Sequence, residues 1–136
     1  MAEMSFTESL IQEFHQNGGV VTRPYPDSTL VLVTMLGARS GVERTLPLEY
    51  MELDGTLHVF ATKGGAPTNP SWYYNLIANP EVGVEYLTET FCARAREVKG
   101  ADRDRLWDEL VSRKPRFGEY TEKTDRVIPV FALDRV

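Results

Sequence analysis

Residues 29–62, TLVLVTMLGARSGVERTLPLEYMELDGTLHVFAT, carry the pattern of β-strands joined by hairpins. Residues 29–36 form a continuous apolar run of strand length, which indicates a strand buried on both faces. Residues 44–53 roughly alternate between apolar and polar side chains and contain Pro47, which favours a sheet edge or a bulge. Asp54-Gly55 is a strong hairpin signal, so the residues after it are expected to return as a third strand.

The flanking sequence adds three strands and three helices. Strands are expected near 82–87, 90–98 and 126–133, and helices near 5–17, 71–79 and 101–113. Strands and helices do not alternate, which argues against a Rossmann domain. The sequence therefore predicts an α+β fold, an antiparallel barrel or roll with peripheral helices. We expect one domain over 1–136, in which 1–28 form the N-terminal helix and loop.

Helix signals flank two of these segments. Ser5 and Glu8 fit a capping box, and the first helix is expected to bury one apolar face made of Phe6, Leu10, Ile11 and Phe14. Asn69 and Pro70 suit the N-cap and first position of the second helix. In the third helix we expect Leu106, Trp107, Leu110 and Val111 to face inward. The stretch 114–125 is expected to be a polar, aromatic-bearing connection.

Composition excludes several classes of protein. The chain has 136 residues, of which 42% are hydrophobic and 26% are charged, which is typical of a globular domain. No apolar run approaches the ~20 residues of a transmembrane helix, and the first 14 residues lack a signal-peptide pattern. A single cysteine and two histidines exclude an internal disulfide and argue against a zinc site. We therefore expect a cytoplasmic protein without a metal.

The distribution of charge points to an anionic small-molecule ligand. The net charge of −5 argues against general nucleic-acid binding. Residues 1–90 hold eleven acidic and only four basic side chains, which are Arg23, Arg39, Arg44 and Lys63. Three of these four cations lie in or beside two glycine-containing loops. Such loops allow backbone amides to approach an anion closely.

Three segments are candidate ligand-binding elements. GARSG at 37–41 brackets Arg39 and Ser40 with glycines, although a plain hairpin turn has the same pattern. TKGGAP at 62–67 resembles a ligand-binding loop but lacks the order of a Walker motif, and a flexible turn is the alternative. PSWYYNL at 70–76 places three aromatic residues in a row on a helix. Either one of them covers a planar ring, or two are core residues and one tyrosine is exposed.

Side chains for independent catalysis are scarce. The sequence has no G-x-S-x-G nucleophile elbow, and His15 and His58 lie in a helix and a strand without partner signals. Cys92 is expected to be a packed strand residue. The acidic side chains Glu49, Glu52 and Asp54 are expected on the exposed side of a hairpin. Any reaction would therefore depend on an organic cofactor, one with a negatively charged tail.

Three motifs together resemble the deazaflavin-dependent nitroreductase family of the flavin/deazaflavin oxidoreductase superfamily. They are TMLGARSGVERTLPLEY (34–50), ATKGGAPTNPSWYYNLIANPEV (61–82) and YTEKTDRVIPVFAL (120–133), within a resemblance that covers about 8–134. The resemblance implies a split β-barrel related to FMN-binding proteins. It also implies a mycobacterial or actinobacterial type of reductase that passes a hydride from reduced coenzyme F-420, a deazaflavin, to an electron-poor acceptor. Acceptors across the family include nitroimidazoles, quinones and unsaturated lactones.

The resemblance also implies site residues. The coenzyme-binding positions carried over by motif are Ala38, Arg39, Ser40, Arg44, Thr45, Leu46, Pro47, Leu48, Glu49, Phe60, Ala61, Thr62, Lys63, Gly64, Gly65, Ser71, Trp72, Tyr73, Tyr74 and Asn75. The acceptor pocket corresponds to 114–120 and contains Phe117 and Tyr120. Here Lys114 and Phe117 replace family tyrosines, and Ala38 replaces a common arginine.

These residues define the expected mechanism. Arg39, Arg44 and Lys63 would hold the phosphate and oligoglutamate tail, Trp72 would pack near the ring, and a proton would come from Tyr120 or from water. We expect planar enones or quinones to be better acceptors than nitroimidazoles. An FMN-dependent split-barrel oxidoreductase and a non-catalytic deazaflavin carrier are the alternatives. A quinone acceptor would also suggest peripheral contact with the inner face of a membrane, and the oligomeric state is left open.

Overall fold

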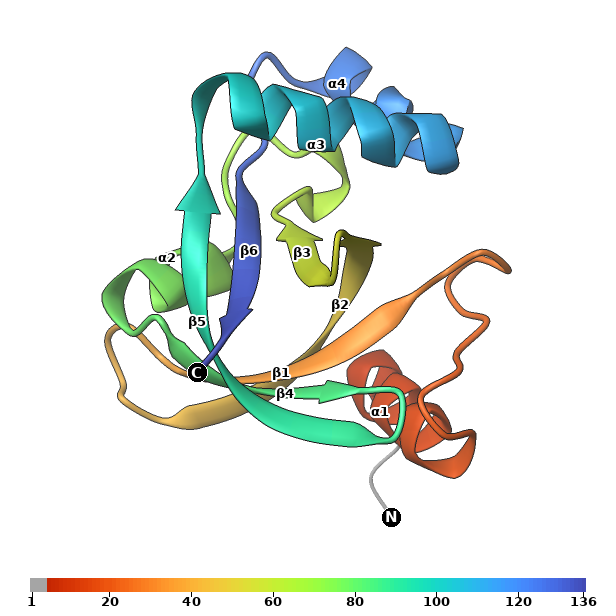
Figure 1. Cartoon of the computed structure of the whole chain (residues 1–136), viewed down its shortest axis with the longest axis vertical. Helices are drawn as coiled ribbons and strands as arrows, with labels where there is room; N and C mark the ends of the chain where they lie inside the picture. Colours follow the sequence, from red (N-terminus) through yellow and green to blue (C-terminus); the bar gives the residue numbers. More distant parts are fainter. Residues whose placement is uncertain (1–4) are drawn as a thin grey trace.

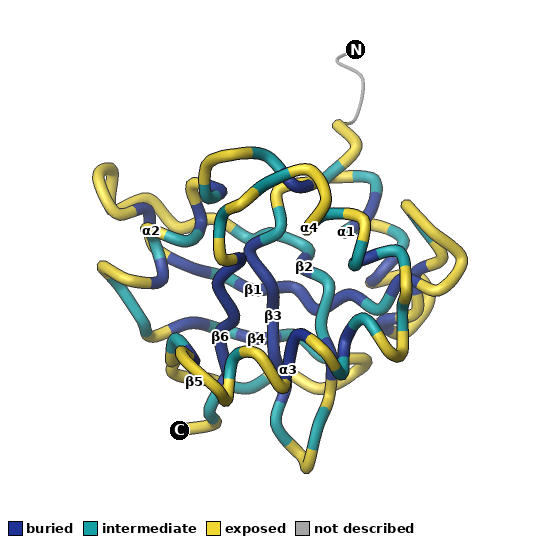
Figure 2. Tube along the Cα trace, turned by 90° about the horizontal axis from the view of Figure 1, so that it is seen from above, coloured by how far each residue is buried: buried dark blue, intermediate teal, exposed yellow. Residues whose placement is uncertain are grey.

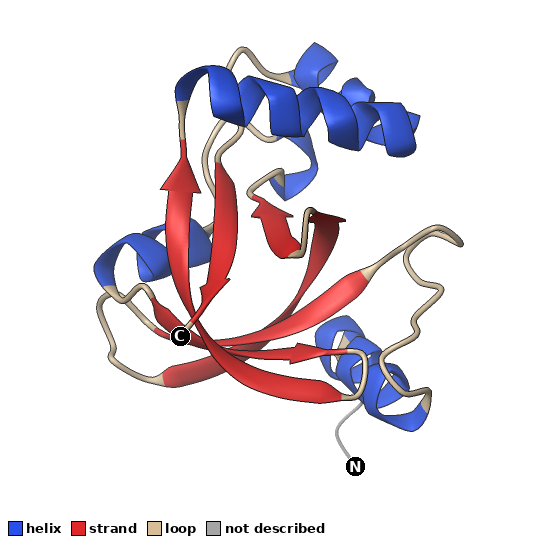
Figure 3. Ribbon diagram, in the orientation of Figure 1, coloured by secondary structure: helices blue, strands red, loops and turns tan. Residues whose placement is uncertain are grey.

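A six-stranded antiparallel barrel forms the body of the protein in a computed structural model that describes residues 5–136 (Figures 1 and 3). The strands are β1 (Leu30–Leu36), β2 (Glu43–Leu53), β3 (Thr56–Phe60), β4 (Glu81–Tyr86), β5 (Glu89–Val98) and β6 (Val130–Arg135). The helices are α1 (Phe6–Gln16), α2 (Ser71–Ala78), α3 (Gly100–Arg113) and α4 (Gly118–Lys123), with two 3-10 turns, η1 (Lys63–Gly65) and η2 (Pro115–Phe117). The α+β class and the barrel predicted from the sequence are confirmed.

The barrel closes in the order β1-β2-β3-β6-β5-β4, and β1 pairs with β4 to complete the ring. Pro47 lies opposite Leu32 of β1, whereas β2 meets β3 only from Tyr50 onward. The proline therefore lies where β2 has a neighbour on one side only, so its missing N–H removes no ladder hydrogen bond on the other side. The edge position expected for Pro47 is confirmed.

Alternate residues of β1 supply two separate cores. Val31 and Val33 face the barrel interior, while Leu30 and Leu32 pack against Leu10 and Phe14 of α1 outside it. All four β1 side chains are at most 6% exposed, so the continuous apolar run does mark a strand buried on both faces (Figure 2).

A third core lies under α3. The helix runs across one end of the barrel (Figure 1) and buries Leu106, Trp107 and Leu110 against Phe60, Val130 and neighbouring side chains. Val111 is only partly buried at the rim of this cluster. The inward face expected for this helix is therefore confirmed.

The segment between α3 and the last strand differs from the sequence-based expectation. Residues 114–125 are mostly helical, as η2 and α4, because Phe117 is 2% exposed and anchors an otherwise polar stretch to the core under α3. The last strand spans 130–135 rather than 126–133, since Arg126 turns its side chain onto the loop after β3 instead of entering the ladder. A polar sequence with one buried aromatic residue gives little helical periodicity, which explains the error.

Four local predictions have mixed outcomes. Ser5 does cap α1, because its Oγ accepts a hydrogen bond from the Glu8 N–H at 3.1 Å. Phe6 is 57% exposed and does not join the buried face of that helix. Asn69 does not cap α2. Pro70 holds the cap position, and the side-chain Oδ1 of Asn69 accepts a hydrogen bond from Arg126. Cys92 is exposed on β5 rather than packed.

Candidate functional site

A cleft of about 370 Å³ opens on the side of the barrel between α1 and α4. Five separate segments contribute to it: α1, the loop before β1 together with Leu30 of β1, β2, the loop and helix after β3, and the η2–α4 segment. Its lining residues are Phe6, Thr7, Leu10, Pro24, Tyr25, Ser28, Leu30, Leu46, Pro47, Leu48, Glu49, Thr62, Trp72, Arg116, Phe117 and Tyr120. Its volume is within the range of small-molecule sites, about 300–1,000 Å³.

Apolar side chains form the walls of the cleft. Leu46 and Leu48 lie on the face of β2 that turns to the barrel interior, and Pro47 lies between them. Trp72 of α2 is 9% exposed and stacks at a tilt on Phe131, with ring centroids 6.1 Å apart. The structure brings Trp72 and Leu46–Leu48 together in one cleft, and these rigid surfaces suit a planar ring.

The loop after β3 has an unusual backbone. Lys63, Gly64 and Gly65 all have positive φ, at 45°, 62° and 81°. A Cβ on Gly65 would lie 3.0 Å from the Lys123 Cβ and 3.1 Å from the Tyr120 carbonyl oxygen, whereas a Cβ on Gly64 would meet nothing within 4 Å. Gly65 therefore lets α4 approach the loop closely, and Gly64 leaves an open backbone surface beside Lys63.

Arg126 fixes this loop, and sequence reasoning missed it. Its guanidinium donates hydrogen bonds to the carbonyl oxygens of Ala61, Thr62 and Ala66, at 2.9–3.1 Å, and to Asn69 Oδ1 at 2.6 Å. Burial lowers the pKa of Arg126. The residue was assigned to a strand because an apolar run follows it, and no sequence signal distinguishes a loop anchor from a strand residue there.

The 37–41 hairpin turn docks on α2. Asn75 accepts the Ala38 N–H at 2.9 Å and donates to the Met35 sulfur at 3.7 Å, and Ser40 Oγ accepts the Val42 N–H at 3.1 Å. Ser40 and Asn75, two expected coenzyme contacts, thus already form hydrogen bonds within the protein. Ala38, Arg39, Ser40 and Arg44 do not line the cleft.

Three cations have no acidic partner among the described residues, and two of them, Arg44 and Lys63, stand next to cleft-lining residues. No carboxylate of residues 5–136 lies within ion-pair distance of Arg39, Arg44 or Lys63. Arg44 is two positions from Leu46 on the same face of β2, about 6.6 Å along the strand, and Lys63 follows Thr62, which lines the cleft. Lys63 Nζ donates only to Thr68 Oγ1, at 3.0 Å. The arrangement provides positive charge beside an apolar slot.

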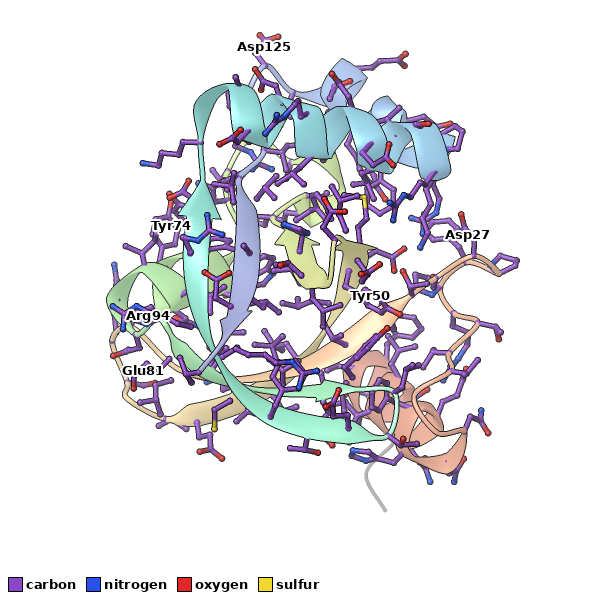
Figure 4. All side chains as sticks on the ribbon, in the orientation of Figure 1. Asp27, Tyr50, Tyr74, Glu81, Arg94 and Asp125 are labelled. Atoms are coloured by element: carbon purple, nitrogen blue, oxygen red, sulfur yellow. The ribbon has the colours of Figure 1, made fainter. Side chains whose placement is uncertain are left out.

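The burial of the aromatic run on α2 matches the second alternative, two packed residues and one exposed tyrosine, while Trp72 also lines the cleft. Trp72 is buried and Tyr73 packs on the barrel core, where its hydroxyl donates to Glu97 at 3.2 Å. Burial, followed by the charge of Glu97, raises the pKa of Tyr73. Tyr74 is 54% exposed and points away from the barrel (Figure 4), so neither tyrosine lines the cleft.

Glu49 is the polar centre of the cleft floor rather than an exposed hairpin residue. Its side chain is 16% exposed and accepts from Lys114 Nζ at 2.8 Å and from Arg116 Nη2 at 2.7 Å. Its second oxygen accepts the Thr29 N–H at 3.0 Å. The expectation of exposure was wrong because both cations come from the η2 segment, which the alternation of β2 cannot reveal.

Phe117 and Tyr120 meet on the opposite wall, as expected for an acceptor pocket. Their rings contact edge to face with centroids 5.5 Å apart. Burial, followed by the nearby phenol of Tyr25, raises the pKa of Tyr120 above its usual value near 10. The Tyr120 hydroxyl therefore keeps its proton at neutral pH and is available as a donor.

The chemistry of the cleft is that of a binding site for an organic cofactor. Residues 5–136 contain no cluster of three potential metal ligands. The apolar walls at Leu46–Leu48 and Trp72, with the cations Arg44 and Lys63 just outside, match in chemical kind the planar ring and the anionic tail of coenzyme F-420. No helix in the same part of the chain has the length and apolar character needed to cross a bilayer.

Comparisons with known proteins identify the family of the chain. The model of the F420H2-dependent quinone reductase family matches residues 8–135. An F420H2-dependent quinone reductase of Mycobacterium tuberculosis is 36% identical over 113 residues, covering 81% of this chain and 74% of its own.

Two solved structures are also similar. An F420-H2-dependent reductase, FDR-A, shares 42% identity with a TM-score of 0.70, over 77% of this chain and 93% of its own. A structure described as a domain-swapped dimer shares 37% identity with a TM-score of 0.72, over 91% and 94% of the two chains. These findings confirm an oxidoreductase that depends on coenzyme F-420. The chain belongs to the F420H2-dependent quinone reductase family.

Proposed function

We propose that the protein reduces a quinone with reduced coenzyme F-420, in the cleft between β2, Trp72 and α4. The observation that carries the proposal is the pairing of an apolar slot with three cations that lack acidic partners. The ring lies against Leu46–Leu48 and Trp72, and the tail reaches Arg39, Arg44 and Lys63. The acceptor then occupies the part of the cleft between Tyr25, Phe117 and Tyr120.

The chemistry needs little from the protein beyond position and a proton. The bound coenzyme supplies a hydride from the ring carbon that replaces flavin N5. The quinone gains one hydride and one proton and becomes a hydroquinone, while the coenzyme loses two electrons and two hydrogens overall. Walls made of Trp72, Pro47 and Phe117 exclude water and hold the two reacting atoms near the ~3–3.5 Å needed for transfer. The Tyr120 hydroxyl donates the proton, and solvent replaces it.

The acceptor preference follows from the size and polarity of the pocket. Phe117 offers a flat apolar surface, and Lys114 is held by Glu49 and Thr29 instead of projecting a hydroxyl into the cleft as tyrosine would. We therefore expect 2-methyl-1,4-naphthoquinone, or a planar unsaturated lactone, to be reduced faster than a nitroimidazole.

The coenzyme is tested by titrating the purified protein with oxidised coenzyme F-420 and, separately, with FMN. We expect tighter binding of coenzyme F-420, because FMN lacks the oligoglutamate tail. Retention of FMN through purification would favour the flavin-dependent alternative. Quinone turnover with NADPH as the only donor would contradict the proposal, and binding without quinone-dependent oxidation would favour a carrier.

The role of Tyr120 is tested with Tyr120→Phe, which removes the hydroxyl and keeps the contact with Phe117. Loss of a positioned general acid lowers turnover by about 100- to 10,000-fold, while coenzyme affinity should hold. Tyr74→Phe is the matched control, since the Tyr74 ring is 54% exposed outside the cleft. A parallel loss of coenzyme affinity would place Tyr120 against the coenzyme instead.

A quinone carried in a membrane would reach the cleft from the side of α1. Phe6 and Tyr25, both cleft residues, are 57% and 43% exposed at this side. We propose peripheral contact through this side when the acceptor has a lipid tail. Co-sedimentation with neutral phosphatidylcholine vesicles that contain menaquinone tests it, with Phe6→Ser as the variant expected to bind less.

A further inference from the structure

Arg116 is a fixed guanidinium at the wall of the cleft, and its side chain is 20% exposed. Its Nε donates to Asp27 Oδ1 at 3.1 Å and its Nη2 donates to Glu49 Oε1 at 2.7 Å. Asp27 lies on the loop between α1 and β1 (Figure 4), so the two carboxylates come from separate segments. The two bonds fix both the position and the plane of the guanidinium.

Aromatic rings support the same group. The Arg116 Cζ lies 4.1 Å from the centroid of the Tyr25 ring and 4.5 Å from that of Phe117. Both rings line the cleft. A guanidinium held against aromatic surfaces is weakly hydrated, so presenting it to a ligand costs less desolvation than presenting an ammonium group.

One edge of the guanidinium remains for a ligand. The hydrogen bonds that Arg116 makes within residues 5–136 use Nε and Nη2, and Nη1 takes part in none of them. Lys114 and Arg116 share the single carboxylate of Glu49, so this trio carries one net positive charge. Asp27, the remaining acid, is 50% exposed, and with it the four side chains are neutral overall. The positive charge available to a ligand is therefore local, at the Nη1 edge of Arg116.

We propose that Arg116 is a catalytic residue that binds a carbonyl oxygen of the acceptor through Nη1 and stabilises the negative charge that gathers on this oxygen during hydride transfer. The inference rests on the proposed function and deepens it, because it limits the acceptors to those with a carbonyl conjugated to the reacting centre. A fixed donor of this kind acts most strongly on charge that develops in the transition state. Tyr120 then protonates the same oxygen, and where the hydride has entered at a ring carbon, a keto–enol shift through solvent moves that carbon's second proton and completes the hydroquinone.

Two other roles for Arg116 predict different kinetic and binding results when it is replaced. If Arg116 only ties the loop before β1 to β2, its replacement lowers stability and raises KM without a specific loss of kcat. If it binds the coenzyme tail, its replacement weakens coenzyme binding. A transition-state role predicts a loss of kcat at unchanged coenzyme affinity.

The experiment compares Arg116→Met and Arg116→Lys with the wild type, using reduced coenzyme F-420 and 2-methyl-1,4-naphthoquinone. Arg113→Met is the control, because Arg113 also bonds a carboxylate and a backbone carbonyl, those of Glu109 and Glu52, but lies outside the cleft. Coenzyme affinity, kcat, KM and thermal unfolding are measured for each protein. Removing one oxyanion donor lowers kcat about 100- to 1,000-fold, and we expect this for Arg116→Met, with a smaller loss for Arg116→Lys.

A second measurement, the binding of an anionic inhibitor, decides the role of Arg116 even if Arg116→Met does not fold. The anion of 2-hydroxy-1,4-naphthoquinone carries a negative charge on the oxygen that Arg116 is proposed to bind. It should inhibit both the wild type and Arg113→Met. Its affinity for Arg116→Lys, the variant that keeps a positive charge beside Glu49 and Asp27, should be at least 10-fold lower. Unchanged kcat and unchanged inhibition in a folded Arg116 variant would overturn the inference, as would a matching loss of coenzyme affinity. Failure of the wild type to reduce any quinone would overturn the proposed function instead, and anion binding would still decide the role of Arg116.

Discussion

At the scale of single residues, Lys63 is the side chain for which a role in coenzyme binding and a role in stability predict the most different results. Its backbone holds φ at 45°, which costs a non-glycine residue about 1–2 kcal/mol. Within residues 5–136 its ammonium group has the Thr68 hydroxyl as its only hydrogen-bond partner. A strained backbone that carries an unneutralised cation beside a cleft is better explained by a ligand than by stability.

Replacement of Lys63 should therefore weaken coenzyme binding and leave the fold intact. We expect Lys63→Ala to lose about 10- to 150-fold in affinity for coenzyme F-420, the equivalent of one charge-assisted contact of ~1.5–3 kcal/mol. The loss should shrink in high salt, because salt screens the wild-type contact.

Two control variants accompany Lys63→Ala: one relieves the backbone strain at residue 63, and the other removes a surface lysine elsewhere. Lys63→Gly should bind as weakly as Lys63→Ala but unfold at a higher temperature, since glycine adopts the positive φ without strain. Lys99→Ala removes an exposed lysine far from the cleft in the sequence and should bind normally. Equal affinity of Lys63→Ala and the wild type at low salt would remove Lys63 from the site.

Tyr50 provides a pH test of the barrel interior. Burial, followed by the phenol of Tyr86 and by the charges of Glu49 and Glu52, raises the pKa of Tyr50 to about 12. The unfolded chain loses this proton near pH 10, so between pH 10 and 12 the unfolded state holds fewer protons and the free energy of unfolding falls as pH rises.

The contribution of Tyr50 is thus fully present below pH 10 and lost above it. We expect the melting temperature of the wild type to fall more steeply over pH 10–12 than that of Tyr50→Phe, which has no proton to lose. Thermal unfolding at intervals of half a pH unit measures both slopes. Identical slopes would show that the Tyr50 phenol does not resist ionisation in the folded protein.

At the scale of elements, α4 reaches the cleft only because the loop after β3 lets it approach. Gly64 and Gly65 both have positive φ, but only Gly65 packs against α4. Substitutions of these two glycines therefore distinguish two effects: the loss of stability from a strained backbone, which both share, and the displacement of Tyr120, which only a change of Gly65 causes.

Gly64→Ala and Gly65→Ala form a matched test of this contact. Both should lose about 1–2 kcal/mol of stability for the left-handed conformation. Gly65→Ala should in addition push α4 outward, because its Cβ would lie 3.0 Å from the Lys123 Cβ. We expect quinone turnover per folded molecule to fall at least 10-fold in Gly65→Ala and to change little in Gly64→Ala. Equal turnover in the two variants would show that α4 does not position Tyr120.

Sequence patterns predicted strands better than the connections that build the cleft. The apolar run of β1 and the Asp54-Gly55 turn are local signals, and both gave the correct element. Glu49 and Arg126 were misplaced because their partners lie more than fifty residues away along the chain. The motif that includes Trp72 located one wall of the cleft, but nothing in the sequence shows that Tyr25 meets Arg116.

At the scale of the whole molecule, a rigid barrel carries a cleft made of loops and short helices. The barrel strands bury Val31, Val59 and Val130 completely, whereas the cleft walls at α1 and α4 are mostly exposed (Figure 2). Opening motions should therefore be confined to the walls, since exchange protection follows burial and hydrogen bonding.

Hydrogen exchange with and without coenzyme F-420 measures this division. We expect coenzyme binding to slow exchange at Thr62–Gly65 and in α4, and to leave the slow amides of β1 and β6 unchanged. The quinone alone should protect only the η2–α4 segment. Uniform protection of the whole chain would mean that the coenzyme stabilises the fold globally and does not order a local site.

The position of β6 has a consequence for synthesis of the protein. This strand is the last of the six in sequence order, yet it lies between β3 and β5. It pairs with Leu57–Phe60 of β3 and with Ala93–Val98 of β5. A nascent chain that still lacks 130–135 exposes two unpaired strand edges, which are templates for aggregation. The barrel therefore cannot close until residues 130–135 have been synthesised. A nonsense mutation directly after Pro129 would remove the strand that joins β3 to β5 and would leave the barrel open.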